Sequence, residues 1–320
     1  MLFFKIVLYV LFNLNEHNIE QAMKINLGLH LGFASTRFYE PKIWTDIVRN
    51  EFNLDYVQFV SDLIEPSLPK KIIKKEINKI KFYTKKYKIN VKHAMTLPRY
   101  NYMGHSNLHI SNYWKNWLKD FIKISSELGV EGAGSLLGIY SFDDLENNFQ
   151  KIRKRVIDGW VDISKYAKTC GIKYLIWEPM SVKREMGETI RATKSLHNEL
   201  NKKSHIPILL NLDVDHGDIK SKNKDDYNPY KIIKSLGKYS PAIHLKQKTK
   251  DIYTHKPFIK KYNKIGLIKP DKIINEISKT GIKEVTLYFE FSFREREPFD
   301  SSSIKDIKES VKYWRKYLDN

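Results

Sequence analysis

The stretch IKYLIWEPMSVKRE, residues 172–185, decides the fold. Its first six residues form the continuous apolar run of a buried β-strand, and the carboxylate of Glu178 follows directly. Pro179 comes next and has no backbone N–H to offer a neighbouring strand, so the strand ends there. In closed barrels of alternating strands and helices, catalytic groups lie at the carboxyl ends of the strands. The stretch therefore predicts a functional acid at the rim of a parallel barrel.

The same alternation of short apolar runs and longer amphipathic runs continues along the chain. We expect strands at 25–31, 55–60, 89–95, 129–136, 172–177, 206–213, 241–245 and 284–290, and helices near 42–52, 68–88, 111–127, 142–169, 187–203, 229–237, 270–280 and 301–317. The strand runs are too continuously apolar for strands that expose one face, and no linker rich in Gly, Ser or Pro divides the chain. The pattern predicts one α/β domain over residues 23–320, a (β/α)8 TIM barrel, with an open doubly wound sheet as the alternative.

Residues 1–22 precede the first expected strand. The apolar run MLFFKIVLYVLFN is shorter than the ~20 residues that a membrane span needs. No cleavage site of small residues follows it, so a signal peptide or an anchor is the minority interpretation. We expect an extension outside the fold and no membrane partner.

Composition is that of a globular protein, because 42% of the 320 residues are hydrophobic and 29% are charged. Cys170 is the single cysteine. A single cysteine excludes an internal disulfide and is typical of a reducing compartment. The composition therefore predicts a cytoplasmic protein.

The formal net charge of +19 suggests nucleic acid as a partner. The lysines, however, are spread along nearly every polar segment, as in residues 69–88, where they alternate with an apolar helix stripe. This stripe consists of Ile73, Ile77, Ile80, Thr84 and Tyr87. A polyanion site should be clustered, so we attribute the charge to a general excess of Lys, Asn and Ile and expect no nucleic-acid partner.

Four consecutive expected strands end in polar side chains that suit a metal ion: Glu178, Asp213, His244 and Glu290. A barrel brings these strand ends around one mouth, where three carboxylates repel one another unless a cation lies between them. Oxygen-rich ligands with one imidazole suit Mn²⁺, Mg²⁺ or Co²⁺. An isolated acid at a strand end is more often a helix cap, and a lone histidine is more often semi-buried and satisfied. Four in succession favour a metal site.

The pattern Glu178-Pro179, Asp213-x-x-His216, His244 and Glu290 resembles the xylose-isomerase-like superfamily of sugar isomerases and epimerases, which includes the ketose 3-epimerases. The resemblance covers the last four strands and, as a rhythm of strands and helices, residues 23–320. It implies one divalent ion held by these four residues, two glutamates that exchange protons with the substrate, and His216 in contact with the sugar. The best match to a further family glutamate is Glu185, one residue farther along than the family spacing. His30 and His93 are expected to line the substrate pocket.

Three stretches are similar to the epimerases that act on erythrulose 1-phosphate: EPMSVKRE, HLKQ at 244–247 and RYNYMGHSN at 99–107. Several cations follow the strand ends, where they could receive a phosphate, although any loop of so basic a chain carries Lys or Arg. They are Lys183, Arg184, Lys246, Arg294 and Arg296. The resemblance implies 3-epimerisation of a ketose phosphate such as erythrulose 1-phosphate through a cis-enediolate.

Three other functions stay open. Endonuclease-IV-like DNA-repair enzymes share this barrel, but they use three zinc ions and an Asp-x-His after the seventh strand, whereas Asp251 and His255 here have three residues between them. An aldose–ketose isomerase on a free sugar and a non-catalytic sugar-binding barrel are the others. Barrels of this kind often pair, which makes a homodimer one expectation.

Overall fold

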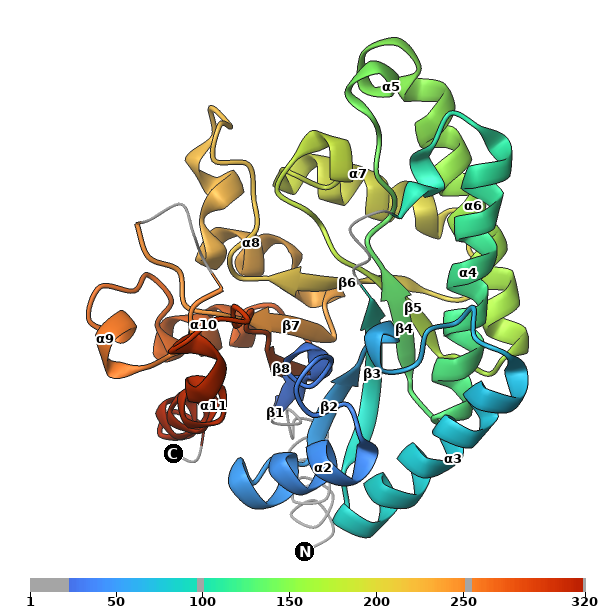
Figure 1. Cartoon of the computed structure of the whole chain (residues 1–320). Coiled ribbons are helices and arrows are strands. Elements are labelled where there is room, and N and C mark those ends of the chain that lie inside the picture. Colours follow the sequence, from blue (N-terminus) through green and yellow to red (C-terminus); the bar gives the residue numbers. More distant parts are fainter. Residues whose placement is uncertain (1–22, 97–100, 251–254, 319–320) are drawn as a thin grey trace, which may run out of the picture.

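The structure is a computed structural model and describes residues 23–96, 101–250 and 255–318 (Figure 1). The predicted extension, residues 1–22, lies outside the described residues. Among the described helices, none is long and apolar enough to cross a membrane.

Eight parallel strands form a closed barrel in which each strand pairs with the next and β8 pairs with β1 (Figure 1). The strands are β1 Lys24–His30, β2 Tyr56–Phe59, β3 Asn90–Thr96, β4 Gly132–Ser135, β5 Tyr174–Trp177, β6 Ile208–Asp213, β7 Ala242–Leu245 and β8 Glu284–Phe289. Because Lys24–Leu29 pairs in register with Glu284–Phe289, the sheet has no open edge there. The predicted (β/α)8 barrel is confirmed, and the open doubly wound sheet is excluded.

Helices surround the barrel. They are α2 Pro41–Asp46, α3 Lys70–Tyr87, α4 Leu108–Glu127, α5 Phe142–Asn147, α6 Phe149–Thr169, α7 Ile190–Asn201, α8 Pro229–Leu236, α9 Lys260–Asn263, α10 Pro270–Ser278 and α11 Phe299–Arg315. Short turns of helix complete the connections: η1 Leu31–Phe33, η2 Ile47–Glu51, η3 Ser61–Leu63, η4 Tyr102–Gly104, η5 Lys183–Glu185, η6 Lys224–Tyr227 and η7 Gly237–Tyr239. The single helix expected at 142–169 is two helices, because the backbone of Asn148 leaves the helical region at φ −127°.

The hydrophobic core lies between the barrel and the helices. The indole rings of Trp44, Trp160, Trp177 and Trp314 are all completely buried there. On α3, Ile77, Ile80 and Thr84 are buried. The lysines of α3 lie on its solvent side, as the stripe predicts.

Strand β4 is built from small residues and lies very close to β5. A Cβ atom added to Gly134 would be 1.6 Å from the carbonyl oxygen of Ile176. The space beside Gly132 is filled by the ring of Tyr174. Glycine is therefore needed at both positions for the two strands to approach and for the aromatic ring to enter the barrel.

Candidate active site

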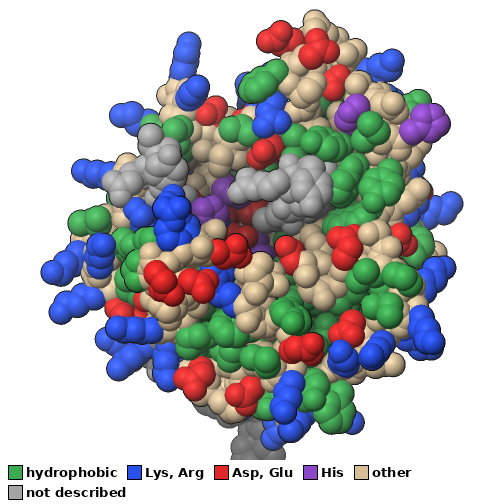
Figure 2. All heavy atoms as spheres, viewed as in Figure 1, with side chains coloured by type: hydrophobic (Ala, Val, Ile, Leu, Met, Phe, Trp, Pro, Cys, Tyr) green, Lys and Arg blue, Asp and Glu red, His purple; other side chains and the backbone are tan. Residues whose placement is uncertain are grey.

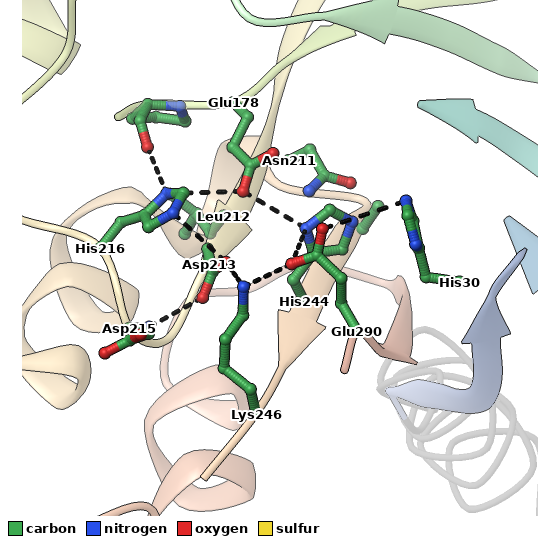
Figure 3. A network of polar contacts seen from close by, with 12 residues as sticks. His30, Glu178, Asn211, Leu212, Asp213, Asp215, His216, His244, Lys246 and Glu290 are labelled. Atoms are coloured by element: carbon green, nitrogen blue, oxygen red, sulfur yellow. Dashed lines mark hydrogen bonds and ion pairs between the residues drawn. The ribbon is translucent and has the colours of Figure 1, made fainter. Parts of the chain in front are cut away.

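The carboxyl ends of β5 to β8 deliver the four expected metal ligands to one place (Figure 3). Glu178 directly follows β5, Asp213 ends β6, His244 lies in β7 and Glu290 directly follows β8. Asp213 is the register partner of His244, which places neighbouring strand ends at one level. One ligand atom from each of the four residues lies within 4.8 Å of the others. The structure therefore brings these side chains together as the strand ends predict.

The imidazole of His244 is central to this cluster. Its Nδ1 lies 3.3 Å from Glu178 Oε1 and 3.3 Å from Glu290 Oε2. Its Nε2 lies 2.6 Å from Oε1 of Gln58, and the Gln58 side-chain amide donates to Asn211 Oδ1 at 2.9 Å. Because an amide oxygen only accepts, Nε2 carries a hydrogen and Nδ1 is the nitrogen that faces the carboxylates. Gln58, from the interior of β2, was not singled out by the sequence.

The four buried groups have different pKa values. Burial raises the pKa of the Glu178 carboxyl. Burial acts in the same direction on Asp213 and Glu290, but the attraction of Lys246 for Asp213, and of His244 and Lys246 for Glu290, is stronger and lowers both pKa values. The pKa of His244 would fall through burial, yet Glu290 and Glu178 raise it to about 10. Glu178 is therefore the acid of the cluster most inclined to hold a proton.

Lys246 lies inside the cluster rather than on a phosphate-binding loop. Its side chain is 1% exposed, and its Nζ is 2.6 Å from Asp213 Oδ2 and also contacts Glu290 Oε2. A further neighbour is His255 Nδ1, at 3.1 Å. Burial would lower the pKa of Lys246, but Asp213 and Glu290 raise it. The buried carboxylates favour this position of Lys246 electrostatically, and its contact with a substrate phosphate remains a prediction.

Two histidines flank the cluster. His216 lies with Nδ1 3.4 Å from Glu178 Oε1 and Nε2 3.5 Å from Asp213 Oδ2, and its Nδ1 is 2.9 Å from the backbone oxygen of Pro179. His30 Nε2 lies 4.0 Å from Glu290 Oε1. Burial lowers the pKa of His30 to about 4, so its ring is neutral. Nδ1 of His30 accepts from the Gly32 N–H, which leaves the Nε2–H directed towards Glu290.

Three other expected substrate ligands lie elsewhere. His93 has both ring nitrogens bonded inside the barrel, Nδ1 to Tyr288 at 2.8 Å and Nε2 to Tyr174 at 2.7 Å. Glu185 lies in η5 with Arg184 at 3.9 Å and is not one of the clustered ligands. Arg294 is exposed beyond β8. Substrate contacts by these three residues remain predictions.

The donor atoms fit a divalent cation. In the described part of the chain, Glu178 Oε2 is buried without any hydrogen-bond donor. Asp213 Oδ2 likewise has no hydrogen bond of regular geometry, although Lys246 Nζ is an ion-pair partner. Buried carboxylate oxygens without donors are costly, and a bound cation supplies the missing interaction. Three carboxylates and an imidazole nitrogen are ligands that Mn²⁺, Mg²⁺ and Co²⁺ accept.

Comparison with known proteins identifies the family. No protein-family model matches the sequence. The D-erythrulose 1-phosphate 3-epimerase of Brucella abortus (strain 2308) is 32% identical over 302 residues, which are 93% of this chain and 97% of the relative. The chain belongs to this epimerase family. As a member of the epimerase family it is an isomerase-class enzyme.

Solved structures share the barrel at lower identity. A Rhodospirillum rubrum protein that carries the name of xylose isomerase has a TM-score of 0.83 at 22% identity, covering 91% of this chain and 99% of that one. The D-psicose 3-epimerase of Clostridium cellulolyticum has a TM-score of 0.64 at 15% identity, covering 92% and 97%. A 3-DHS dehydratase of Bacillus anthracis also has 0.64, at 13% identity, covering 92% and 99%. The predicted xylose-isomerase-like barrel is confirmed, and its presence in a dehydratase shows that this fold alone does not decide the reaction.

Acidic and histidine side chains gather in the mouth of the epimerase barrel, whereas lysine and arginine are dispersed over the surface (Figure 2). Figure 2 shows acidic and histidine side chains at the bottom of a hollow on the viewed face, with lysine and arginine side chains dispersed around the outline of the molecule. The dispersed arrangement agrees with a general lysine excess.

Proposed function

We propose that the chain is a 3-epimerase of a ketose phosphate, with D-erythrulose 1-phosphate as the first candidate, and that it depends on one divalent metal ion. The observation that carries the proposal is the meeting of Glu178, Asp213, His244 and Glu290 within 4.8 Å of one another. The substrate comes from the name of the Brucella relative. The metal-assisted proton transfer is inferred from the three carboxylates and the imidazole of this site.

Epimerisation beside a ketone is a problem of moving one proton. A bound Mn²⁺, Mg²⁺ or Co²⁺, held by the four ligands, would polarise the ketone and neutralise the negative charge of the enediolate. One glutamate removes the proton from C3, which leaves a cis-enediolate. The other glutamate returns a proton to C3 from the other side, and the configuration there is inverted.

The positions and pKa shifts of Glu178 and Glu290 support these complementary roles. They follow β5 and β8, which are separated around the barrel by β6 and β7, so they reach the site from different directions. Their pKa values are shifted in opposite directions, upwards for Glu178 and downwards for Glu290. A pair of carboxyl groups with separated pKa values can hold one proton and accept another.

The flanking histidines hold the sugar in this account. His30 presents an Nε2–H beside Glu290, and His216 lies beside Glu178 and Asp213. Each ring can hydrogen-bond a substrate hydroxyl next to the reacting carbon. A fixed orientation of the C3–H bond towards one glutamate is what makes a weak base effective.

The test is product analysis with Mn²⁺ present, by NMR for the pentulose phosphates and by optical rotation or chiral separation for erythrulose and its 1-phosphate, because C3 is their single stereocentre and the C3 epimer is the enantiomer. The panel contains D-erythrulose 1-phosphate, free erythrulose and pentulose phosphates, and we expect the C3 epimer of a phosphorylated ketose. Formation of an aldose from a free ketose would instead assign the isomerase alternative. Cleavage of abasic DNA, with no change in any ketose, would overturn the proposal in favour of an endonuclease.

A further inference from the structure

Lys246 is a buried cation in the same space as the predicted metal ion. It stands two residues after His244, so both side chains point from the end of β7 to the same side (Figure 3). Its side chain is 1% exposed. A lysine so deeply buried needs anionic partners, and here these are Asp213 and Glu290.

The ammonium group uses the oxygens that an ion would need. Asp213 Oδ1 accepts the backbone N–H of Asp215 at 2.8 Å, so Oδ2 is its free ligand atom, and Lys246 Nζ lies 2.6 Å from Oδ2. Glu290 Oε2 is the oxygen next to His244 Nδ1, at 3.3 Å, and Lys246 Nζ contacts this oxygen as well. One oxygen from each acid is therefore shared between the lysine and the candidate ion.

An ammonium group and a divalent ion repel each other strongly when they share buried oxygens. Lysine differs from the other site residues in that its charge is carried on a flexible four-carbon stem, which allows withdrawal without movement of the backbone. We propose that Lys246 is a displaceable internal cation: it occupies the Asp213–Glu290 side of the metal site and withdraws when a divalent ion binds. The inference rests on the proposed metal site and adds a competitor to it.

Displacement of Lys246 predicts a change in Mn²⁺ affinity that can be measured without following turnover. Lys246→Met removes the competing charge and keeps most of the apolar stem. We expect this variant to bind Mn²⁺ at least about tenfold more tightly than the wild type, measured from free Mn²⁺ by electron paramagnetic resonance. Its metal-free Tm should fall, because Asp213 and Glu290 lose their buried counter-charge, and its gain in Tm on adding Mn²⁺ should be larger.

Lys248→Met is the matched control. Lys248 follows two residues later and also neutralises an acid, with Nζ 3.5 Å from Asp215 Oδ1 and 3.1 Å from the Asp215 backbone oxygen. It contacts neither Asp213 nor Glu290. Removal of this charge should change Mn²⁺ affinity much less than Lys246→Met does. Equal or weaker Mn²⁺ binding by Lys246→Met, relative to the wild type, would overturn the proposal.

A second measurement covers the case in which Lys246→Met does not fold. Crystal structures of the wild type with and without Mn²⁺ should show Nζ in contact with both acids only in the metal-free crystal. Nζ still in contact with both acids beside a bound ion would overturn displacement.

Binding of Mn²⁺ by Lys246→Met but not by the wild type would support the inference and would remove metal dependence from the proposed function. Absence of binding in both overturns the metal site and the inference together, while epimerase activity, assayed separately, still decides the reaction.

Discussion

Gln58 determines which nitrogen of His244 faces the carboxylates. Its Oε1 accepts from Nε2 at 2.6 Å, and its own amide group is held by Asn211 at 2.9 Å. A histidine that binds a metal ion usually donates its other N–H to such an acceptor, which fixes the ring and increases its basicity. Gln58 is therefore a positioning residue for the predicted ion rather than a ligand.

Replacement of Gln58 should weaken metal binding without touching a ligand. Gln58→Met removes the acceptor, and we expect Mn²⁺ affinity to fall about 10- to 100-fold. Gln58→Glu keeps an acceptor, and the Asn211 amide can turn its unpaired Nδ2 towards the new carboxylate, so this variant should retain much more of the affinity. A titration in which Gln58→Met binds Mn²⁺ as tightly as the wild type would show that His244 does not need this bond.

The two glutamates should be the most sensitive positions for turnover. Glu178→Gln and Glu290→Gln keep the shape of each side chain but remove its capacity to carry a proton, so we expect epimerisation rates to fall about 10²- to 10⁴-fold at saturating Mn²⁺. Glu199→Gln on the outer helix α7, where the acid pairs with Arg153 at 2.6 Å, serves as the control with near-normal rate. Rates close to the wild type in either site variant would remove that glutamate from proton transfer.

Among the elements, the β4–β5 contact depends most on the absence of side chains. Gly134→Ala would place Cβ 1.6 Å from the carbonyl oxygen of Ile176, which is backbone and cannot rotate away. We expect a loss of about 3 kcal/mol or more in the free energy of unfolding. Gly159→Ala in α6 is the opposite case, because the nearest atom to its new Cβ is 3.8 Å away. A helix interior gains about 0.5–1 kcal/mol from this change.

Chemical denaturation followed by circular dichroism compares these two glycine variants directly. We expect the two substitutions to change the free energy of unfolding in opposite directions. A Gly134→Ala variant as stable as the wild type would mean that β4 can move away from β5 without loss.

Strand β3 carries a histidine that should make stability depend on pH. Burial first, and then the charge of Lys92, lower the pKa of His93 from 6.5 to about 3, so the folded chain keeps the ring neutral. The unfolded chain binds a proton below pH 6.5 that the folded chain rejects, so this contribution is complete above pH 6.5 and is lost as the pH falls towards 3.

His93→Gln cannot titrate, and its stability should fall less steeply with decreasing pH than that of the wild type. The difference in slope between pH 6 and pH 4 should approach about 1.4 kcal/mol per pH unit. Free energies of unfolding at several pH values test this. Parallel slopes for the two proteins would show that His93 is protonated in the folded chain as readily as in the unfolded one.

At the scale of the whole molecule, the barrel explains why the sequence located the ligands. Glu178, Asp213, His244 and Glu290 each stand at the end of an apolar run, and barrel closure brings such ends together whatever the side-chain torsions are. Lys246 was located by the same rule, but its contacts with Asp213 and Glu290 were not predicted, because the rule does not say whether a long side chain points outwards to a phosphate or inwards to buried acids.

The rule for strand ends does not predict the contacts of residues inside the strands. Gln58 lies within β2, and a buried glutamine has no sequence signature until its partner across the barrel is known. His93 stands three residues before the end of β3, and its bonds to tyrosines of β5 and β8 were not predicted from the sequence. Contacts between distant strands decide which side chains pair inside the barrel. The periodicity of the sequence does not reveal these contacts.

Entry of solvent deuterium at C3 of the substrate would show that this cluster moves a proton on and off the carbon beside the ketone. The protein is incubated in D₂O with Mn²⁺ and D-erythrulose 1-phosphate, and deuterium is located by NMR. We expect deuterium to enter C3 and no other carbon. Absence of deuterium from C3 while optical rotation shows that the D-ketose is consumed, or entry of deuterium at another carbon, would exclude this proton transfer.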